Sequence, residues 1–377
     1  MEIGSDVLII GGGIQGAAAA FYLAREGVSV HVLEKDYVGR HASGVNAGGV
    51  RTLNRHFAEL PLSVAAKAIW LNIEELLGED CGFLPVGQIR VAETEQDLEH
   101  LRTRAQAVSQ LGLPYAEEII DRHELYERLP ALVSGCVGAA LVANDGYANP
   151  YRTTVAFKLA AVRAGATFHE KMAAVAITRK DGGWTVTTGN RSRFRALVLL
   201  NCAGAWGARI AEQLGDKVPL APNGSMLMVT ARLPKMVAPV VGAVRRSLSF
   251  KQFANGTVLI GGGHRAPVDI DHNETKVSLP GLAKAARIAI ELFPFMAKAK
   301  IVRFWSGIEG FMPDGLPVIG PSLSSPNAYH AFGFCAHGFQ LGPAVGAVLA
   351  ELAIYGTSCT AIDAFSIDRL TRSAAKV

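Results

Sequence analysis

The sequence has few cysteines, few aromatic residues and no marked excess of either charge. Its 377 residues include five cysteines, 7% aromatic residues and 37 basic against 33 acidic side chains, a net charge of +4. The cysteines lie far apart and never form a C-x-x-C pair, so the sequence indicates neither a disulfide framework nor a zinc site. The nearly balanced, scattered charges argue against a nucleic-acid-binding surface. We expect a protein of a reducing compartment with no metal and no nucleic-acid partner.

Long hydrophobic runs are missing near the amino terminus. Residues 7–10 form an apolar run of only four residues, and the six residues before it contain Glu2 and Asp6 but no basic residue. A signal peptide has a basic region before a longer apolar segment, and a membrane span needs about 20 apolar residues. The sequence therefore predicts a cytoplasmic protein with no transmembrane segment.

Glycine and aliphatic residues are abundant instead. The chain has 40 glycines and 50% hydrophobic residues, which is typical of α/β enzymes, and its length allows about two to three domains. Residues 7–10 form a strand-like apolar run, residues 17–26 are helix formers, and residues 28–33 are rich in β-branched side chains. This order predicts a βαβ unit.

The turn of this βαβ unit carries a dinucleotide-binding pattern. Gly11 allows a tight turn, Gly13 lets backbone N–H groups approach a pyrophosphate, and Gly16 lets the helix pack closely on the strand. Glu34 lies 23 residues after Gly11, where a carboxylate can accept hydrogen bonds from an adenosine ribose. The alternative is a glycine-rich turn that binds nothing, but the strand, the helix and the acid together favour dinucleotide binding.

A second glycine run, at residues 261–263, follows the strand-like residues 258–260. Pro267 comes soon after it, so no helix begins there and no helix dipole would face a phosphate. We predict a strand that ends in a flexible turn. Elsewhere the patterns predict an Asp-Gly hairpin at 173–188, strands at 83–92 and 196–201, and helices at 95–111, 121–129, 153–164, 282–292 and 341–355.

Several further segments resemble those of one flavoprotein superfamily. Together with the βαβ unit, and in this order, they resemble the flavin-dependent D-amino acid oxidase superfamily, in particular its branch of glycine oxidases, sarcosine oxidases and amino acid dehydrogenases. The segments are HASGVNAGG at 41–49, DGYANP at 145–150, NCAGAW at 201–206, WSG at 305–307 with PDGLP at 313–317, and GFCAHGFQLGP at 333–343.

The resemblance extends over nearly the whole chain and implies its fold class. We expect an α/β protein in which a discontinuous, Rossmann-like FAD-binding domain contains an inserted, mainly antiparallel β-sheet substrate domain. The expected FAD-binding domain comprises residues 1–80, 145–220 and 306–377, and the expected substrate domain comprises residues 81–144 and 221–305.

The resemblance also implies one bound FAD. Backbone N–H groups at residues 338–340, where a helix begins, would stabilise the negative charge of a reduced flavin, although a glycine-rich helix start that binds nothing is the alternative. Relatives with covalent FAD have a cysteine or a histidine where this chain has Gly307 and Asn46, so we expect noncovalent FAD, with His41 as the alternative attachment point. The expected cofactor-binding residues are Gly11, Gly13, Ile14, Gly16, Glu34, Lys35, Ser43, Asn46, Ala47, Gly48, Val175, Gly204, Gly338, Phe339 and Gln340.

Two positions bear on the substrate. Sarcosine-oxidase-like members bind the substrate carboxylate with an arginine at the position of Arg51, which Arg55 follows, and with a lysine at the position of Gln340. Glycine-oxidase-like members have an arginine near the position of Glu309. We expect Arg51 to bind a carboxylate and Glu309 to pair with a cationic or secondary amine. The alternatives are an arginine in an ordinary ion pair and a glutamate that caps a turn.

Other side chains are further candidates for the same site. His337 would face the flavin edge and relay a proton, although a histidine satisfied by local backbone is equally consistent with the sequence. Tyr147 and Arg265 are expected to line the substrate cavity. Trp206 and Trp305 are assigned to packing.

The implied reaction is oxidation of the C–N bond of an amino acid or N-substituted amino acid. Hydride would move from the α-carbon to flavin N5, giving an imine that water hydrolyses to an oxo acid. Glu309 favours sarcosine-, proline- or opine-like substrates, and oxygen, a quinone or a partner redox subunit would accept the electrons. The alternatives are FAD-dependent oxidation of a 2-hydroxy acid, with His337 as the base, and a flavin-binding subunit without turnover.

Overall fold

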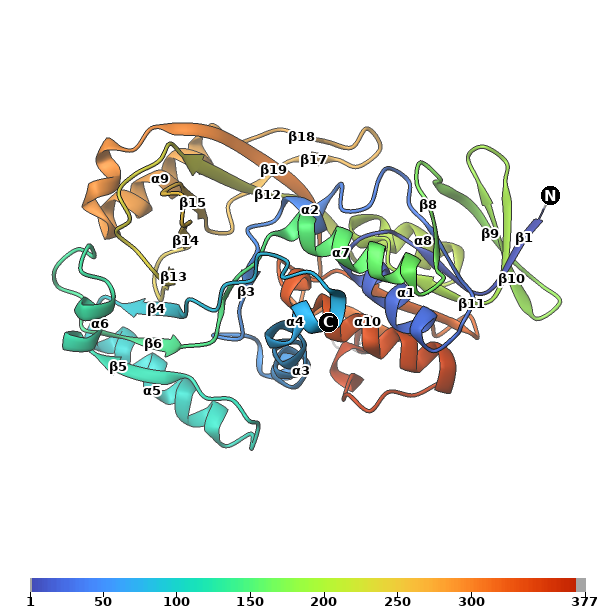
Figure 1. The fold of residues 1–377 in the computed structure, drawn as a ribbon, viewed down its shortest axis with the longest axis horizontal. Coiled ribbons are helices and arrows are strands. Elements are labelled where there is room, and N and C mark those ends of the chain that lie inside the picture. Colours follow the sequence, from blue (N-terminus) through green and yellow to red (C-terminus); the bar gives the residue numbers. More distant parts are fainter. Residues whose placement is uncertain (1, 371–377) are drawn as a thin grey trace.

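The chain folds around two large β-sheets, which a computed structural model of residues 2–370 places toward opposite ends of the long axis (Figure 1). One sheet has eight strands in the order β20-β21-β11-β1-β2-β8, with β10 paired to β11 and β9 paired to β10. These strands are β1 (Glu2–Ile10), β2 (Val30–Leu33), β8 (Thr167–His169), β9 (Ala174–Lys180), β10 (Gly183–Thr188), β11 (Arg193–Asn201), β20 (Val318–Pro321) and β21 (Ala328–Phe332).

The centre of this sheet is parallel and buried on both faces. β1 pairs in parallel with β2 and β11, and β11 pairs in parallel with β21. Val7 and Ile9 of β1 pack against helices on one face, while Leu8 and Ile10 pack on the other face with the β9–β10 hairpin. A strand covered on both sides needs apolar residues at successive positions, which explains the continuous run at 7–10.

Helices on the first face form the largest core. They are α1 (Ile14–Arg25), α3 (Leu60–Leu71), α7 (Pro150–Arg163) and α10 (Gly338–Tyr355), and the shorter α8 (Gly207–Gln213) covers the second face. By length and composition α10 could cross a membrane, and it is the one helix within residues 2–370 that could. However, 67% of it is buried inside the fold, where it packs on α1 and α3.

Helices α1 and α10 run parallel and touch through glycines. A Cβ at Gly342 would lie 2.5 Å from Ile14, and one at Gly346 would lie 2.4 Å from the Cβ of Ala18. Because the contacts advance along both helices in the same direction, the two amino termini lie at the same end. The absence of a side chain at residue 346 therefore sets how closely the helices approach.

The second large sheet has nine strands and is mainly antiparallel; only β4 and β13 pair in parallel. Its order is β16-β12-β15-β14-β13-β4-β6-β5, and β19 pairs with β12. The strands are β4 (Gln88–Ala92), β5 (Glu118–Asp121), β6 (Gly138–Val142), β12 (Ala221–Thr230), β13 (Val240–Ala243), β14 (Ser249–Gln252), β15 (Val258–Gly261), β16 (Arg265–Ala266) and β19 (Ile301–Phe311).

The two faces of the nine-stranded sheet differ in chemistry. Ile89, Phe250 and Met228 belong to the face that packs on α9 (Leu279–Leu292). Side chains alternate along a strand, so Arg90 and Lys251 belong to the opposite face, which meets the loop at residues 41–49. Two hydrogen bonds show this contact: Lys251 Nζ donates to the Ala47 carbonyl (2.5 Å), and Trp305 Nε1 donates to the Val45 carbonyl (2.8 Å).

The remaining elements are short or peripheral. β3 pairs with β7, and β17 pairs with β18, in separate two-stranded sheets. Their bounds, with those of the other helices, are β3 (Gly49–Val50), β7 (Gly146–Tyr147), β17 (Val268–Asp269), β18 (Glu274–Thr275), α2 (Ala42–Val45), α4 (Ile73–Leu77), α5 (Glu95–Ser109), α6 (Arg122–Arg128), and the 3₁₀ helices η1 (Phe57–Glu59), η2 (Gly204–Trp206), η3 (Pro294–Lys298) and η4 (Asp363–Phe365).

The fold class predicted from the sequence is confirmed, and so are the predicted helices, within a few residues at their ends. The hairpin is confirmed as β9 and β10, with Asp181 and Gly182 both at positive φ in its turn. The strand predicted at 83–92 begins only at Gln88, because an isolated bridge and turns precede it. The glycine run at 261–263 ends β15 without a helix, as predicted. β19 crosses the domain boundary expected between residues 305 and 306.

Substituting Gly346 with alanine should destabilise the fold by roughly 2 kcal/mol, since the added methyl group meets rigid atoms of α1 rather than a flexible side chain. Equilibrium denaturation at a fixed FAD concentration measures the change. Gly4→Ala is the matched control because a Cβ there has no atom within 4 Å. Equal stability of the Gly346→Ala variant and wild type would contradict the proposed close contact.

Candidate active site

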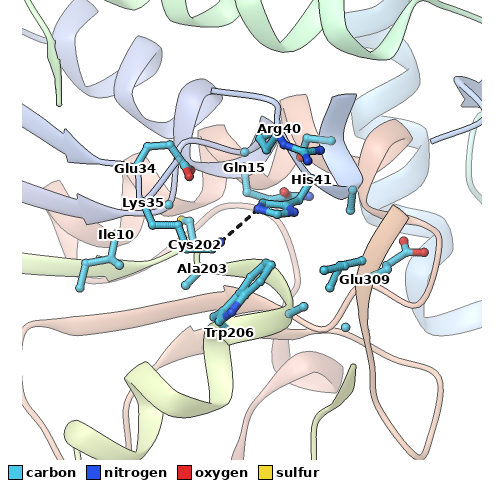
Figure 2. Close-up of a pocket in the computed structure, with 18 of the residues that line it drawn as sticks. Ile10, Gln15, Glu34, Lys35, Arg40, His41, Cys202, Ala203, Trp206 and Glu309 are labelled. Atoms are coloured by element: carbon cyan, nitrogen blue, oxygen red, sulfur yellow. Dashed lines mark hydrogen bonds between the residues drawn. The ribbon is translucent and has the colours of Figure 1, made fainter. Parts of the chain in front are cut away.

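A cavity of about 410 Å³ lies where β1, β2 and β11 end and where α1 and α10 begin. Figure 2 shows Glu34 toward one end of the cavity and Glu309 toward the other, with His41 and Trp206 between them. The carboxyl ends of parallel strands and the amino ends of helices are where Rossmann-like proteins bind ligands.

Close steric contacts explain the glycines in the turn after β1. Gly11 has φ of 109°, and a Cβ there would lie 2.3 Å from the Cys202 carbonyl oxygen at the end of β11. A Cβ at Gly16 would lie 2.0 Å from the Gly11 carbonyl oxygen, and one at Gly13 would lie 2.9 Å from Ser43 Oγ. Gly11 and Gly13 line the cavity with Ile14, whose N–H donates to Ser43 Oγ (2.9 Å), whereas Gly16 lies behind them.

Glu34, directly after β2, binds the backbone of this turn. Its carboxylate accepts hydrogen bonds from the N–H groups of Gly12 (2.7 Å) and Asp36 (2.8 Å). Burial raises the pKa of Glu34, and the two N–H donors oppose that effect. The side chain lines the cavity, so its remaining lone pairs are available to accept hydrogen bonds from a ligand.

Lys35 and Trp206 line the same wall. Lys35 Nζ lies 4.0 Å from the centre of the Trp206 ring and donates to Asn273 Oδ1 (2.6 Å). His41 packs against that ring, with centroids 4.6 Å apart. The assignment of Trp206 to packing alone was wrong, because the tight turn after β11 places η2, and the ring with it, in the cavity wall. Gly204, from the same turn, also lines the cavity.

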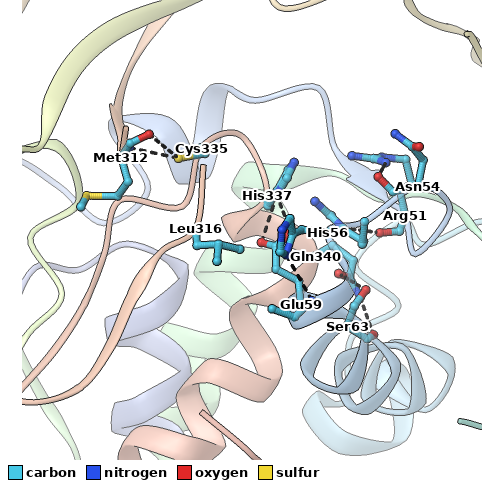
Figure 3. A network of polar contacts seen from close by, with 12 residues as sticks. Arg51, Asn54, His56, Glu59, Ser63, Met312, Leu316, Cys335, His337 and Gln340 are labelled. Carbon is cyan, nitrogen blue, oxygen red and sulfur yellow. Dashed lines mark hydrogen bonds and ion pairs between the residues drawn. The ribbon is translucent and has the colours of Figure 1, made fainter. Parts of the chain in front are cut away.

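The start of α10 contributes Gly338 and Phe339 but not Gln340. Gln340 is fully buried, where its amide exchanges hydrogen bonds with Ser63 of α3 (2.9 and 2.8 Å), as Figure 3 shows. It therefore fastens α10 to α3 and lies outside the cavity. Gln15 is a lining residue that the sequence did not reveal, and it donates to the Gly338 carbonyl (2.9 Å), linking the two helix starts.

The loop at residues 41–49 brings Ser43 and Asn46 to the cavity, while Ala47 and Gly48 lie outside its lining. The Asn46 side chain accepts the N–H of Gly48 (2.7 Å), so it shapes the loop as well as lining the cavity. Val175 also lies outside, with 55% of its surface exposed, because β9 turns alternate side chains outward and leaves Ala174 facing the cavity.

Among the residues expected to meet the substrate, Glu309 lines the cavity. Its carboxylate accepts a hydrogen bond from Ser225 Oγ (2.6 Å) and another from the N–H of Ala336, and burial raises its pKa. Ala336 and Cys335 both have positive φ (69° and 52°), a strained backbone that aims this N–H at Glu309. No ion pair to Glu309 is formed within residues 2–370.

The other substrate candidates lie outside the lining of this cavity. Arg265 is placed over the Phe311 ring (4.0 Å), and the Tyr147 ring lies 5.5 Å from Lys251 Nζ. Arg51 and His337 share a polar network deeper between the domains (Figure 3). His337 Nδ1 lies 2.9 Å from the Glu59 carboxylate, and burial, reinforced by nearby Arg55, lowers the pKa of His337 to about 4.

These features define a dinucleotide-binding enzyme of the Rossmann-like class. Comparison with known proteins gives the particular family. The chain belongs to the DAO family of FAD dependent oxidoreductases, which it matches over residues 6–352. The resemblance found in the sequence is thereby confirmed, and the cofactor of this family is FAD.

This chain aligns with different shares of its relatives' lengths. The chain is 28% identical to glycine oxidase of Geobacillus kaustophilus (strain HTA426), with 97% of each covered, and 26% identical to a subunit of the opine oxidase of Rhizobium meliloti, with 86% and 87% covered. It spans 43% of dimethylglycine dehydrogenase of Rattus norvegicus, at 26% identity over 93% of this chain.

Solved structures share the fold closely. The crystal structure of glycine oxidase from Geobacillus kaustophilus aligns with a TM-score of 0.88 at 26% identity over 97% of this chain and 98% of that one. L-proline dehydrogenase from P. horikoshii aligns with a TM-score of 0.92 at 23% identity over 99% of each chain, which is a likeness of fold.

Lys251 is a buried lysine that the sequence did not single out. It is 1% exposed, its ammonium donates to the Ala47 carbonyl, and burial lowers its pKa to about 7. A lysine whose pKa is lower in the folded than in the unfolded state costs stability, fully below pH 7 and progressively less up to about pH 10.4.

Lys251→Met should therefore raise the free energy of unfolding by roughly 2 kcal/mol at pH 6, after the lost hydrogen bond offsets part of the gain. The difference from wild type should shrink toward zero or reverse near pH 10.5, where the lysine is neutral in both states. Denaturation curves between pH 6 and 10.5 measure this trend. A difference that stays constant across that range would contradict the lowered pKa.

Proposed function

We propose that this protein oxidises the C–N bond of an amino acid or an N-substituted amino acid. A bound FAD would supply the hydride acceptor, and water would hydrolyse the product imine to an oxo acid. The names of the relatives, which include a glycine oxidase, an opine oxidase and a dimethylglycine dehydrogenase, support this class of substrate.

The observation that carries the proposal is the Glu309 carboxylate in the cavity wall. It has hydrogen-bond donors in Ser225 and Ala336, and the charge of Arg265 acts on it, but no cation forms an ion pair with it within the part of the chain that the structure describes. A substrate ammonium would supply that charge. Because burial raises the pKa of Glu309, the carboxylate is also suited to hold a proton as the amine becomes neutral before hydride transfer.

Arg51 is our candidate for binding the substrate carboxylate. Its guanidinium donates to the carbonyls of Leu53 and Asn54, so it has no carboxylate partner in these bonds. Gln340 is at the position of a lysine in sarcosine-oxidase-like proteins. Its amide is bonded to Ser63, so it is not available to bind the substrate carboxylate, and an arginine would bind it instead. Tyr147 stays a candidate through its place beside Lys251, and Arg265, over the Phe311 ring, and His337, bonded to Glu59, are further candidates for direct contact.

We further propose how FAD is held. Glu34 and Lys35 would bind the ribose end, Gly11, Gly13, Ile14 and Ser43 the pyrophosphate, and Asn46, Gly204, Gly338 and Phe339 the flavin end. Two helix amino termini face that region, and both favour negative charge. Gly307 and Asn46 offer no side chain for a covalent bond, and His41 is engaged by Asp36 (2.6 Å), so the attachment is noncovalent and acid should release the flavin.

The electron acceptor and the cellular location are part of the same proposal. Oxygen, a quinone or a partner redox subunit would reoxidise the flavin, and the protein would act in the cytoplasm. Reoxidation rates with each acceptor and fractionation of the producing cell test these points.

Anaerobic absorbance of the holoprotein tests the reaction. Titration with sarcosine, proline or an opine should bleach the flavin band, because an amine donates hydride, whereas the corresponding 2-hydroxy acids should not. Fast recovery in air would indicate an oxidase, and slow recovery would indicate a dehydrogenase with another acceptor. Failure of every amine to bleach a flavin that dithionite reduces would exclude the proposed reaction.

Replacing Arg51 with methionine should raise KM roughly 10- to 100-fold and change kcat less, since it removes a charge-assisted bond to the substrate carboxylate, a group whose charge does not change in the reaction. Steady-state kinetics with the best amine measures both constants. Arg122→Met, at an exposed position on α6, is the control and should leave KM unchanged. An unchanged KM in Arg51→Met would exclude Arg51 as the carboxylate-binding residue.

A further inference from the structure

A buried network between the two domains holds more positive than negative charge. Five cations interact with three carboxylates, and His337 is neutral because its pKa is lowered to about 4 by burial, so two positive charges remain without a carboxylate. The cations are Arg51, Arg55, Lys67, Arg90 and Arg104, and the carboxylates are Glu59, Glu117 and Asp145.

The carboxylates already have partners. Asp145 binds Lys67 and the backbone N–H groups of Thr52 (2.8 Å) and Leu53 (2.9 Å). Glu117 forms an ion pair with Arg104 (2.8 Å), and Glu59 binds His337. None of these bonds reaches Arg51, Arg55 or Arg90.

Two of the remaining arginines have buried nitrogens with no hydrogen bond in the described part of the chain. These are Nη1 of Arg55, a residue 2% exposed, and Nε of Arg90. Arg55 Nε donates to the Arg51 carbonyl (2.9 Å), and Arg90 Nη2 has only a long contact of 3.5 Å with the Val244 carbonyl. Burial, reinforced by the charge of Arg51, lowers the pKa of Arg55 to about 9 and that of Arg90 to about 10.

Unpaired buried guanidinium groups are costly, and a bound anion removes the cost. With Arg51 assigned to one substrate carboxylate and the charge of Glu59 acting on Arg55, one positive charge remains on Arg55 and Arg90 together without a counterion. We propose that these two arginines bind a second carboxylate, so that the preferred substrate is an amino dicarboxylic acid. This inference rests on the proposed function, whose site it extends.

The location of the network supports a substrate that extends from the cavity. His337 borders the network through Glu59, and its chain neighbours Ala336 and Gly338 line the cavity. Arg90 lies on the polar face of the nine-stranded sheet, the face that also carries Lys251 against the loop at 41–49. A diacid could thus place its amine near Glu309 and both carboxylates toward the arginines.

Binding without turnover tests the second carboxylate independently of the reaction. Perturbation of the flavin absorbance of the holoprotein gives Kd for succinate and for propionate, which differ by one carboxylate, at constant ionic strength. We expect succinate to bind at least about tenfold more tightly. Equal or weaker binding of succinate would overturn the inference, even if amines are oxidised.

Arginine variants test which residues bind the second carboxylate. Arg90→Gln and Arg55→Gln should each reduce the succinate-to-propionate affinity ratio by about tenfold, whereas Arg102→Gln, at an exposed position on α5, should leave the ratio unchanged. If Arg55→Gln does not fold, Arg90→Gln decides alone, because Arg90 is only partly buried. An unchanged ratio in Arg90→Gln would overturn the assignment of that residue.

Turnover then separates the two proposals. Iminodiacetate and sarcosine share a secondary amine and differ by one carboxylate, so kcat/KM for iminodiacetate should exceed that for sarcosine. Oxidation of sarcosine with no preference for the diacid would leave the proposed function intact and overturn this inference. A succinate preference with no amine oxidised would support the anion site and exclude the proposed reaction.

Discussion

The parallel contact between α1 and α10 is the constraint on which the rest of this structure depends. Glycines at 342 and 346 let α10 lie directly on Ile14 and Ala18, so both helices begin at the same cavity. Two parallel helix dipoles side by side repel each other, and the repulsion is greatest where their amino termini meet. An anion placed there offsets that repulsion, which couples the packing of the core to the charge of the cofactor.

The two faces of the nine-stranded sheet have different roles beside this cavity. Its apolar face is covered by α9 and contributes stability, while its polar face is buried against the loop at 41–49. Lys251 and Trp305 hold that loop through backbone carbonyls, so the sheet positions the loop whatever side chains the loop carries. The same face carries Arg90 and Glu309, two side chains of opposite charge.

The sequence predicted most accurately the structural features that depend on residues close together in the chain. The βαβ unit, its glycines and Glu34 follow from short spacings, and the helices follow from periodicity and helix-forming residues. Positions that depend on distant packing were missed: Gln340 points to Ser63 because α3 covers that side of α10, and Trp206 reaches the cavity because β11 ends in a tight turn. Nothing in the spacing of Arg55, Arg90 and Lys251 indicated that burial would leave their charges unbalanced.

The order of the strands also has a consequence for how the protein is made. The cofactor cavity needs β21 beside β11 and the start of α10 beside α1, yet these late segments lie some three hundred residues after Gly13 in the chain. The contacts that complete the site are therefore among the most distant in sequence, and such contacts form slowly. During translation the first βαβ unit emerges early but has no complete binding site to offer. Flavin incorporation must consequently follow completion of almost the entire polypeptide.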